Sequence, residues 1–292
     1  MRVACILVRR AKYPESMPTV VPEVRIRAVN DRPRRADGAF VLYWMIAARR
    51  RRANFALQRA VERSDPDADC ASGLSPYLHF GHLSAHQVFA GLARHEDWRR
   101  AGIKPTTSGQ RGWLGMSAAA ESFFDEFVTW RELGYNWCWQ REDYADLASL
   151  PTWAKATLQQ HADDPREHVY SLEEFAASAT HDEVWNAAQR QLRASGALQN
   201  YLRMLWGKKV LERTRTPTAA MAILVELNNR YALDGRDPNS YSGIAWVLGR
   251  YDRPWAPERP IYGVVRYMSS TNTVRKLRMK EYLARWSKRP GP

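Results

Sequence analysis

The chain has 292 residues, of which 45% are hydrophobic, so it can bury a sizeable core in one or two domains. Its formal net charge of +13 favours a polyanionic partner. No run approaches the roughly 18 apolar residues of a membrane span, and the segment VACILV is too short for a signal-peptide core, so we expect a globular cytoplasmic protein.

The positive charge gathers at the two ends of the chain. Residues 1–63 carry 15 Lys and Arg against 5 Asp and Glu, and residues 248–292 carry 11 against 3, which leaves the middle acidic. Basic segments can follow a phosphate backbone, although solvated charge on a flexible tail explains the first segment equally well. The 12 Trp and 13 Tyr add rings that could stack on bases or on a planar ligand.

The cysteines support neither a disulfide framework nor a metal site. Cys5, Cys70 and Cys138 lie far apart and form no CxxC pair. We therefore expect a reducing compartment, ordinary thiols and no bound metal.

The first part of the chain predicts little regular structure. Residues 1–38 are rich in Pro and Arg and show no sustained period, so we expect them to be irregular and basic. The run FVLYWMI, residues 40–46, is typical of a buried strand, and residues 49–64 have a helical pattern. A strand followed by a helix normally opens an α/β unit, but no such unit follows.

From Ser64 onward the patterns are helical almost throughout, which predicts a mainly α fold. We expect helices at residues 84–95, 118–140, 181–195, 197–213, 218–231 and 274–286. Ser84 is the expected N-cap of the first, and Gly235 and Pro238 are expected to act as breakers after the fifth. No internal repeat is present.

Five motifs occur in order between about Arg63 and Trp286: GLSPYLHFGHLS, ESFFDEFVTWREL, YLRMLWGKKVLE, LNNRYALDGRDPNSYSGIAW and DRPWAPERPIYGVVRYMS. Together they resemble the class II cyclobutane pyrimidine dimer photolyases of the photolyase/cryptochrome family, which are light-driven, FAD-dependent DNA repair enzymes. The resemblance implies an α-helical FAD-binding catalytic domain over residues 62–292. It also implies a monomeric lyase that binds double-stranded DNA containing pyrimidine dimers, at the nucleoid if the source is bacterial.

The chain departs from that family before the first motif. There, a strand and helix like those at residues 39–61 open a Rossmann-like antenna domain, whereas here Glu62 leads directly to RSDPDADCASGLSPYLHFG. We interpret residues 39–61 as a remnant of the antenna domain whose strand has no sheet to join. Because the family's second chromophore sits in or against that domain, we expect FAD to be the only cofactor.

The resemblance assigns contacts to the FAD diphosphate near the first motif. Ser72, Leu74 and Ser75 are the candidates, through backbone N–H groups and hydroxyls near a helix start. On its own, the pair Ser75-Pro76 is more simply a plain turn. The family has a tyrosine where this chain has Arg59, which could supply a phosphate contact of its own.

Three further residues are implied beside the flavin ring. The resemblance pairs Arg203 with Asp234 next to the isoalloxazine, where the pair can stabilise negative charge on reduced flavin. It aligns Asn228 with the residue that faces flavin N5, where an amide can donate or accept a hydrogen bond. Without the motif, Asn228 is more simply a helix C-cap.

The resemblance assigns dimer recognition to Glu126, Trp130, Met204, Trp246 and Arg63. The tryptophans can pack on the faces of flipped-out thymines, and Glu126 can accept hydrogen bonds from a base edge and steady the charge on the dimer. Glu126 and Trp130 are four residues apart, hence on one face of an α-helix. As bare sequence, the pair would be an ordinary half-buried face.

Trp185 and Trp206 resemble the two-tryptophan chain that carries an electron to photoexcited FAD. The resemblance implies that Trp206 is the donor nearer the flavin and Trp185 the donor farther from it. Core packing is the plain alternative for each ring. A third tryptophan found in some relatives is Arg213 here, so that branch is missing.

Two other classes of function remain open from the sequence. A cryptochrome-type flavin photoreceptor would keep FAD and the tryptophans but not the dimer-contacting residues, which this chain retains. An inactive DNA-binding remnant would keep the basic surface and lose the yellow flavin.

Overall fold

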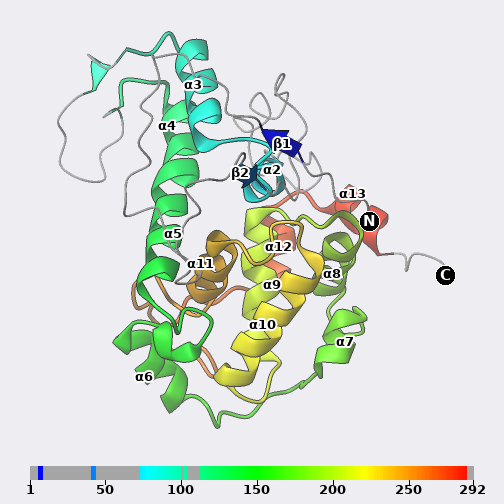
Figure 1. Cartoon of the computed structure of the whole chain (residues 1–292). Coiled ribbons are helices and arrows are strands. Elements are labelled where there is room, and N and C mark those ends of the chain that lie inside the picture. Colours follow the sequence, from blue (N-terminus) through cyan, green and yellow to red (C-terminus); the bar gives the residue numbers. More distant parts are fainter. Residues whose placement is uncertain are drawn as a thin grey trace.

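The computed structural model describes residues 6–8, 41–43, 73–99, 102–103, 112 and 114–287, and most of these residues are helical (Figure 1). The predicted mainly α fold is confirmed. The helix expected at residues 49–64, and with it Arg59 and Arg63, lies outside the described residues, as does Ser72.

A short two-stranded ladder precedes the helices. Strand β1 (Ile6–Val8) pairs antiparallel with β2 (Val41–Tyr43), with Leu7 opposite Leu42. The predicted strand in the run FVLYWMI is confirmed over Val41–Tyr43, but the prediction that it has no partner is wrong. The ILV run of β1 stands inside a basic segment without periodicity, and a three-residue strand leaves no pattern to detect.

The helical part begins with two short helices and one long composite helix. Their bounds are α2 (Ser75–His79), α3 (Ala85–His95), α4 (Ala118–Phe124), a π-helical segment (Asp125–Trp130) and α5 (Arg131–Gln140). The predicted N-cap of α3 is confirmed, because Ser84 and Gln87 form a reciprocal capping box. The expected helix at residues 118–140 is continuous, but its centre is π-helical, a form that is frequent at functional sites.

The remaining helices follow in the second half of the chain. They are a 3₁₀ turn (Leu147–Ser149), α6 (Thr152–Gln160), α7 (Leu172–Ala176), α8 (Glu183–Ser195), α9 (Asn200–Glu212), α10 (Pro217–Tyr231), α11 (Pro238–Val247), α12 (Ser270–Lys276) and α13 (Lys280–Trp286). The prediction of a single helix at residues 274–286 is wrong, because two helices, α12 and α13, cover this region. Leu277 turns to extended backbone and ends α12, and the break places Met279 in the main core.

Helices α8 and α9 start later than predicted because side chains cap them. Asp182 accepts the backbone N–H groups of Val184 and Trp185 and so fixes the start of α8. Gly196, at a φ of 67°, ends this helix in the left-handed region. Gln199 then accepts the N–H of Leu202 at the start of α9.

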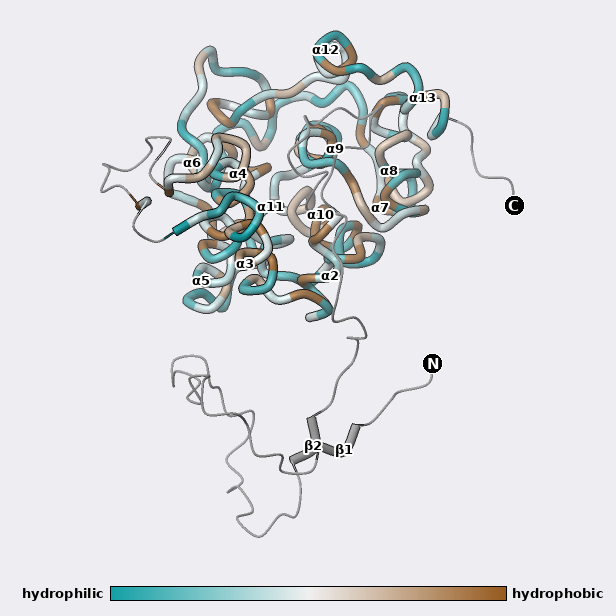
Figure 2. The backbone as a smooth tube through the Cα atoms, turned by 90° about the horizontal axis from the view of Figure 1, so that it is seen from above, coloured by the Kyte–Doolittle hydropathy of each residue, from teal (hydrophilic) through white to brown (hydrophobic). Residues whose placement is uncertain are grey.

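Helix α9 lies near the centre of the helical body, with α8 and α10 beside it (Figure 2). Its apolar residues are buried on several sides, as expected of a helix enclosed by others. Gly207 allows α11 to approach closely, since a Cβ at this position would lie 2.5 Å from Cγ2 of Val247. No described helix has the length and apolar character that a membrane span requires.

Candidate active site

Arg203 of α9 lies beside two polar residues of the α10–α11 region. Its Nη2 is 3.4 Å from Oδ1 of Asp234, and its Nη1 is 3.5 Å from Oδ1 of Asn228. Both contacts are long, and the Arg203 and Asp234 side chains stay partly exposed, so neither group is saturated by the other. The pairing that the resemblance implied for Arg203 is therefore present.

Asn228 supplies a test of whether these residues fit a flavin. Its side chain is buried, and its amide nitrogen Nδ2 has no hydrogen-bond partner within the described ranges. A buried amide donor without an acceptor costs about 1–3 kcal/mol. The polar edge of an isoalloxazine ring carries acceptor nitrogens and oxygens, so an unpaired donor beside a guanidinium fits FAD.

Trp185 and Trp206 form a stacked pair in the core. Their ring centroids are 6.4 Å apart and their planes differ by 7°. Each indole N–H is hydrogen-bonded, from Trp185 to the backbone oxygen of Trp206 at 2.9 Å and from Trp206 to Oε1 of Gln189 at 2.8 Å. The pair is therefore held rigidly, with its rings facing each other.

The pair does not reach the surface by itself. Trp185, predicted to be the donor farther from the flavin, has 0% of its surface exposed, and Trp206 has 2%. The ring contacts continue from Trp185 to Phe175, with centroids 5.0 Å apart, and from Phe175 to half-buried Tyr170 at 5.7 Å. This continuation could not be predicted, because Phe175 and Tyr170 lie outside the five motifs.

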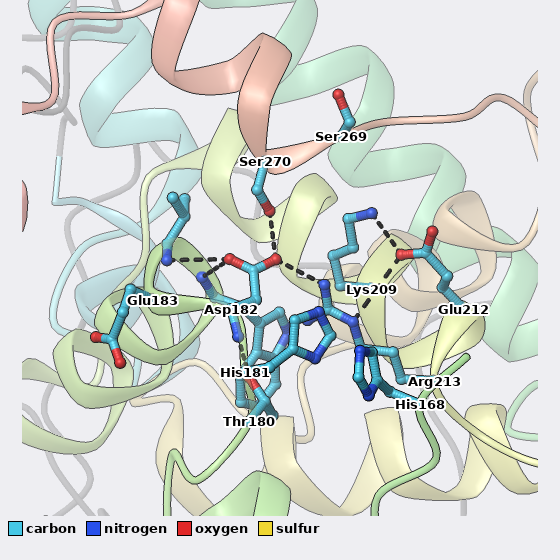
Figure 3. A network of polar contacts seen from close by, with 12 residues as sticks. His168, Thr180, His181, Asp182, Glu183, Lys209, Glu212, Arg213, Ser269 and Ser270 are labelled. Carbon is cyan, nitrogen blue, oxygen red and sulfur yellow. Dashed lines mark hydrogen bonds and ion pairs between the residues drawn. The ribbon is translucent and has the colours of Figure 1, made fainter. Parts of the chain in front are cut away.

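Arg213, at the position of the third tryptophan of some relatives, belongs to a buried polar network (Figure 3). Its Nη2 is 2.7 Å from Oδ2 of Asp182, which also accepts the hydroxyl of Ser270. Burial acts to raise the pKa of Asp182, but the hydrogen bonds from Ser270 and Arg213 outweigh it and the pKa is lowered. An ion pair thus occupies the position of the third tryptophan of some relatives.

The predicted dimer-contacting tryptophans meet each other. Trp130 of the π-helical segment and Trp246 of α11 have ring centroids 4.5 Å apart, with planes inclined by 36°. A base cannot enter between two rings at this separation. We call this pair of closely packed rings the tryptophan wedge.

Glu126 lies in the same π-helical segment and is exposed to solvent. The protein around its carboxylate removes part of its hydration, and Asp125 adds negative charge, so the pKa of Glu126 is raised. Glu126 and Trp130 would share one face of an α-helix, but these residues are π-helical. In the π-helical segment the indole N–H of Trp130 instead donates to Asp125, five residues earlier, at 3.2 Å.

Tyr251 is a residue of this region that the sequence analysis missed. Its ring contacts Trp130 at 5.7 Å and Trp246 at 5.8 Å between centroids, in both cases edge to face. It directly precedes the motif DRPW, and that position was its only signal. Met204, predicted to contact the dimer, is half-buried on α9 next to Arg203.

The candidate phosphate-binding segment is anchored at the start of α11. Oδ2 of Asp237 lies 3.2 Å from the ring nitrogen Nδ1 of His79. The same oxygen accepts a hydrogen bond from the hydroxyl of Tyr135, also at 3.2 Å. Burial, with the Asp237 carboxylate, raises the pKa of Tyr135 to about 12, so its phenol stays a donor. Ser75 is the exposed first residue of α2, while the side chain of Leu74 is buried in a small apolar cluster. Leu74 can therefore serve a ligand only through its backbone.

No group of three or more His, Cys, Asp or Glu within the described part of the chain is arranged to hold a metal ion. The side chains near Arg203 and the tryptophan wedge are carboxylates, amides and aromatic rings.

Comparisons with known proteins find relatives of this chain among curated sequences and solved structures. A deoxyribodipyrimidine photo-lyase of Methanothermobacter thermautotrophicus is 42% identical over 223 residues, which is 76% of this chain and 45% of the relative. One from Oryza sativa subsp. japonica is 37% identical over 227 residues, 76% of this chain and 41% of the relative. The chain thus spans less than half the length of these curated relatives.

Solved structures share the fold. A class III photolyase from Agrobacterium tumefaciens superposes with a TM-score of 0.54 at 19% identity, over 79% of this chain and 42% of that one. A Synechocystis cryptochrome gives a TM-score of 0.50 at 16% identity, over 75% of this chain and 38% of that one. No family model matches the chain. From its relatives at 37 to 42% identity and its helical fold, the chain belongs to the photolyase/cryptochrome family.

Proposed function

We propose that this chain binds FAD and uses light to split cyclobutane pyrimidine dimers in double-stranded DNA, as a photolyase of class II. The observation that carries the proposal is the unpaired amide of Asn228, buried beside the loose Arg203–Asp234 pair. That arrangement supplies a donor and a positive charge to a flavin ring. When bound in its fully reduced form, FAD supplies the photoexcited electron that opens the dimer.

The chain's residues divide the work of binding. Arg203 offers a positive charge to the ring, and Asp234 limits the cost of burying that charge. Asn228 donates or accepts a hydrogen bond at the ring edge. Ser75 and the backbone at Leu74, with Ser72 before them, are proposed to face the diphosphate.

Dimer recognition is proposed to use the tryptophan wedge. Trp130 and Trp246 offer apolar faces to the two flipped pyrimidines, and Met204 and Arg63 complete the contacts. The Glu126 carboxylate accepts a hydrogen bond from a base edge and so fixes the dimer against the wedge. Because the two rings of the wedge are in contact, no base can insert between them. Binding on the wedge therefore favours bases that leave the double helix easily.

Trp206 and Trp185 are proposed to keep the cofactor reduced by passing an electron toward it. Their parallel rings and their shared hydrogen bond hold the two indoles in a fixed geometry. Arg213 leaves no branch at the third position, so the route must pass through Trp185.

FAD is proposed to be the only chromophore, with residues 39–61 a remnant of the antenna domain and residues 1–38 a basic segment before it. An action spectrum of repair that follows reduced flavin alone supports this, and a second bound pigment contradicts it. We further propose that the chain works as a monomer in the cytoplasm, at the nucleoid if it is bacterial.

A repair assay tests the proposed function. Purified protein should be yellow, and after chemical reduction it should restore a thymine-dimer oligonucleotide under blue light and not in the dark. Bound flavin without light-dependent repair would instead support a photoreceptor. A colourless, folded protein that binds DNA would support an inactive remnant.

A further inference from the structure

Tyr251 carries two energetic costs at one position. Its φ is 63°, in the left-handed region that bulky residues rarely adopt. Its hydroxyl is buried, and in the part of the chain that the structure describes it has no hydrogen-bond partner. An unpaired buried hydroxyl costs about 1–3 kcal/mol, and the strained backbone adds about 1–3 kcal/mol more.

Packing explains the ring of Tyr251 but not the hydroxyl. The ring lies edge to face with both members of the tryptophan wedge, and the guanidinium of Arg250 lies 5.2 Å from its centroid. Phenylalanine would make all three contacts without burying an unpaired oxygen. A glycine would adopt this φ without strain but would lose the ring. Tyrosine therefore makes sense here only if something outside the described residues meets its hydroxyl.

The geometry points to Tyr251 as a further substrate-binding residue, whose hydroxyl pairs with the polar edge of a flipped-out pyrimidine packed on the tryptophan wedge. A pyrimidine edge presents carbonyl acceptors and an N–H donor, and a phenol can serve either. The inference rests on the proposed function, because it requires a base outside the helix. Undamaged DNA keeps its bases stacked and offers no such edge, so the hydroxyl adds to discrimination rather than to general DNA affinity.

Tyr251→Phe tests the inference, because it retains the ring and removes only the hydroxyl. Dissociation constants are measured in the dark for one oligonucleotide with and without a single thymine dimer, and the melting temperature is measured for the free protein. We expect dimer affinity to fall about five- to tenfold with no change for undamaged DNA. We also expect the melting temperature to rise, because an unpaired polar group is removed.

Tyr144→Phe is the matched control. Tyr144 is half-buried, and its ring packs edge to face on Tyr241 without contact to the wedge. This variant should leave dimer discrimination at the wild-type value. Equal losses on both DNAs, no loss on either, or a lower melting temperature in Tyr251→Phe would overturn the inference, the last because it would mean that the hydroxyl is already paired within the protein.

The wild-type protein separates this inference from the proposed function. If it binds both DNAs equally and repairs neither in light, the proposed function fails and the inference falls with it. If it prefers and repairs dimer DNA while Tyr251→Phe behaves identically, only the inference fails.

Discussion

The indole of Trp185 faces the indole of Trp206 with planes 7° apart. The indole N–H of Trp185 also donates to the backbone oxygen of Trp206. One hydrogen bond therefore fixes both the distance and the orientation of the pair. Because both rings are buried, their environment changes little with solvent. Such a fixed geometry suits the electron transfer that we propose for the pair.

Trp206→Phe should stop the light-dependent build-up of reduced flavin in the presence of an external reductant, because phenylalanine is far harder to oxidise. Repair by chemically pre-reduced enzyme should stay near the wild-type rate. Trp286→Phe, on α13 at the edge of the core, is the control for loss of a partly buried tryptophan. Normal photoreduction in the Trp206 variant would exclude this route.

Arg203→Met should weaken FAD binding about 10- to 100-fold, since hydrogen bonds to a charged group contribute about 1.5–3 kcal/mol. It should also make the remaining flavin harder to reduce, because Asp234 is left without its positive partner. Arg193→Met removes the same charge from α8, where the guanidinium lies 5.9 Å from the Tyr231 ring. Flavin content after dialysis and the reduction potential measure both effects, and equal losses in the two variants would contradict the assignment.

Asp125→Asn should extend dimer binding to more acidic pH. Partial loss of hydration raises the pKa of the exposed Glu126 first, and the charge of Asp125 raises it further. Removing that charge lowers the pKa, so the Glu126 carboxylate persists to lower pH and continues to accept from the base. Asparagine retains an oxygen that can accept the Trp130 N–H.

The measurement is dimer affinity across the acid range in wild type, Asp125→Asn and Glu126→Gln. The acid-side fall should move to lower pH in Asp125→Asn and disappear in Glu126→Gln, which should also repair more slowly. An unshifted fall in Asp125→Asn would mean that another group titrates.

Lys208 should make the free energy of unfolding depend on pH. Its side chain is fully buried, and its ammonium donates to the backbone oxygen of Val247. Burial lowers its pKa from 10.5 to about 7, although Asp252 acts to raise it. Between these values the unfolded chain binds more protons, so stability rises with pH and is lost as pH falls from 10.5 toward 7.

Lys208→Met should flatten that dependence. Urea unfolding measures the free energy of unfolding of both proteins at pH 7 and pH 9. The excess of the variant over the wild type should be largest at pH 7 and smaller at pH 9. A stability difference that stays constant between the two pH values would mean that Lys208 keeps an ordinary pKa in the folded protein.

Periodicity predicted the long helices because their apolar residues repeat over several turns, but short elements escaped it. Helices α6 and α7 were not predicted, and α7 has only five residues. Pro238 was read as a breaker, whereas it is the first residue of α11, after the capping carboxylate of Asp237. Proline fits that position because its missing N–H would have no partner there.

In the candidate site, too, some residues could be predicted from the sequence and others could not. The motifs brought together Arg203, Asp234 and Asn228, since each occupies a recognisable place in a string of residues. Tyr251 could not be found in that way, because its strained backbone and unpaired hydroxyl exist only in three dimensions. The π-helical turn at Trp130 was likewise hidden, because its sequence has the same apolar pattern as an α-helix.

A single carboxylate, that of Asp237, holds α2 through His79 and α5 through Tyr135 while it caps α11. The proposed cofactor segment and the helices that flank the wedge are therefore one mechanical unit. Binding of FAD at the cofactor segment, or of damaged DNA at the wedge, should stiffen this unit. Each ligand should therefore favour binding of the other. By thermodynamic reciprocity, damaged DNA should tighten FAD binding by the same factor that FAD tightens damaged DNA.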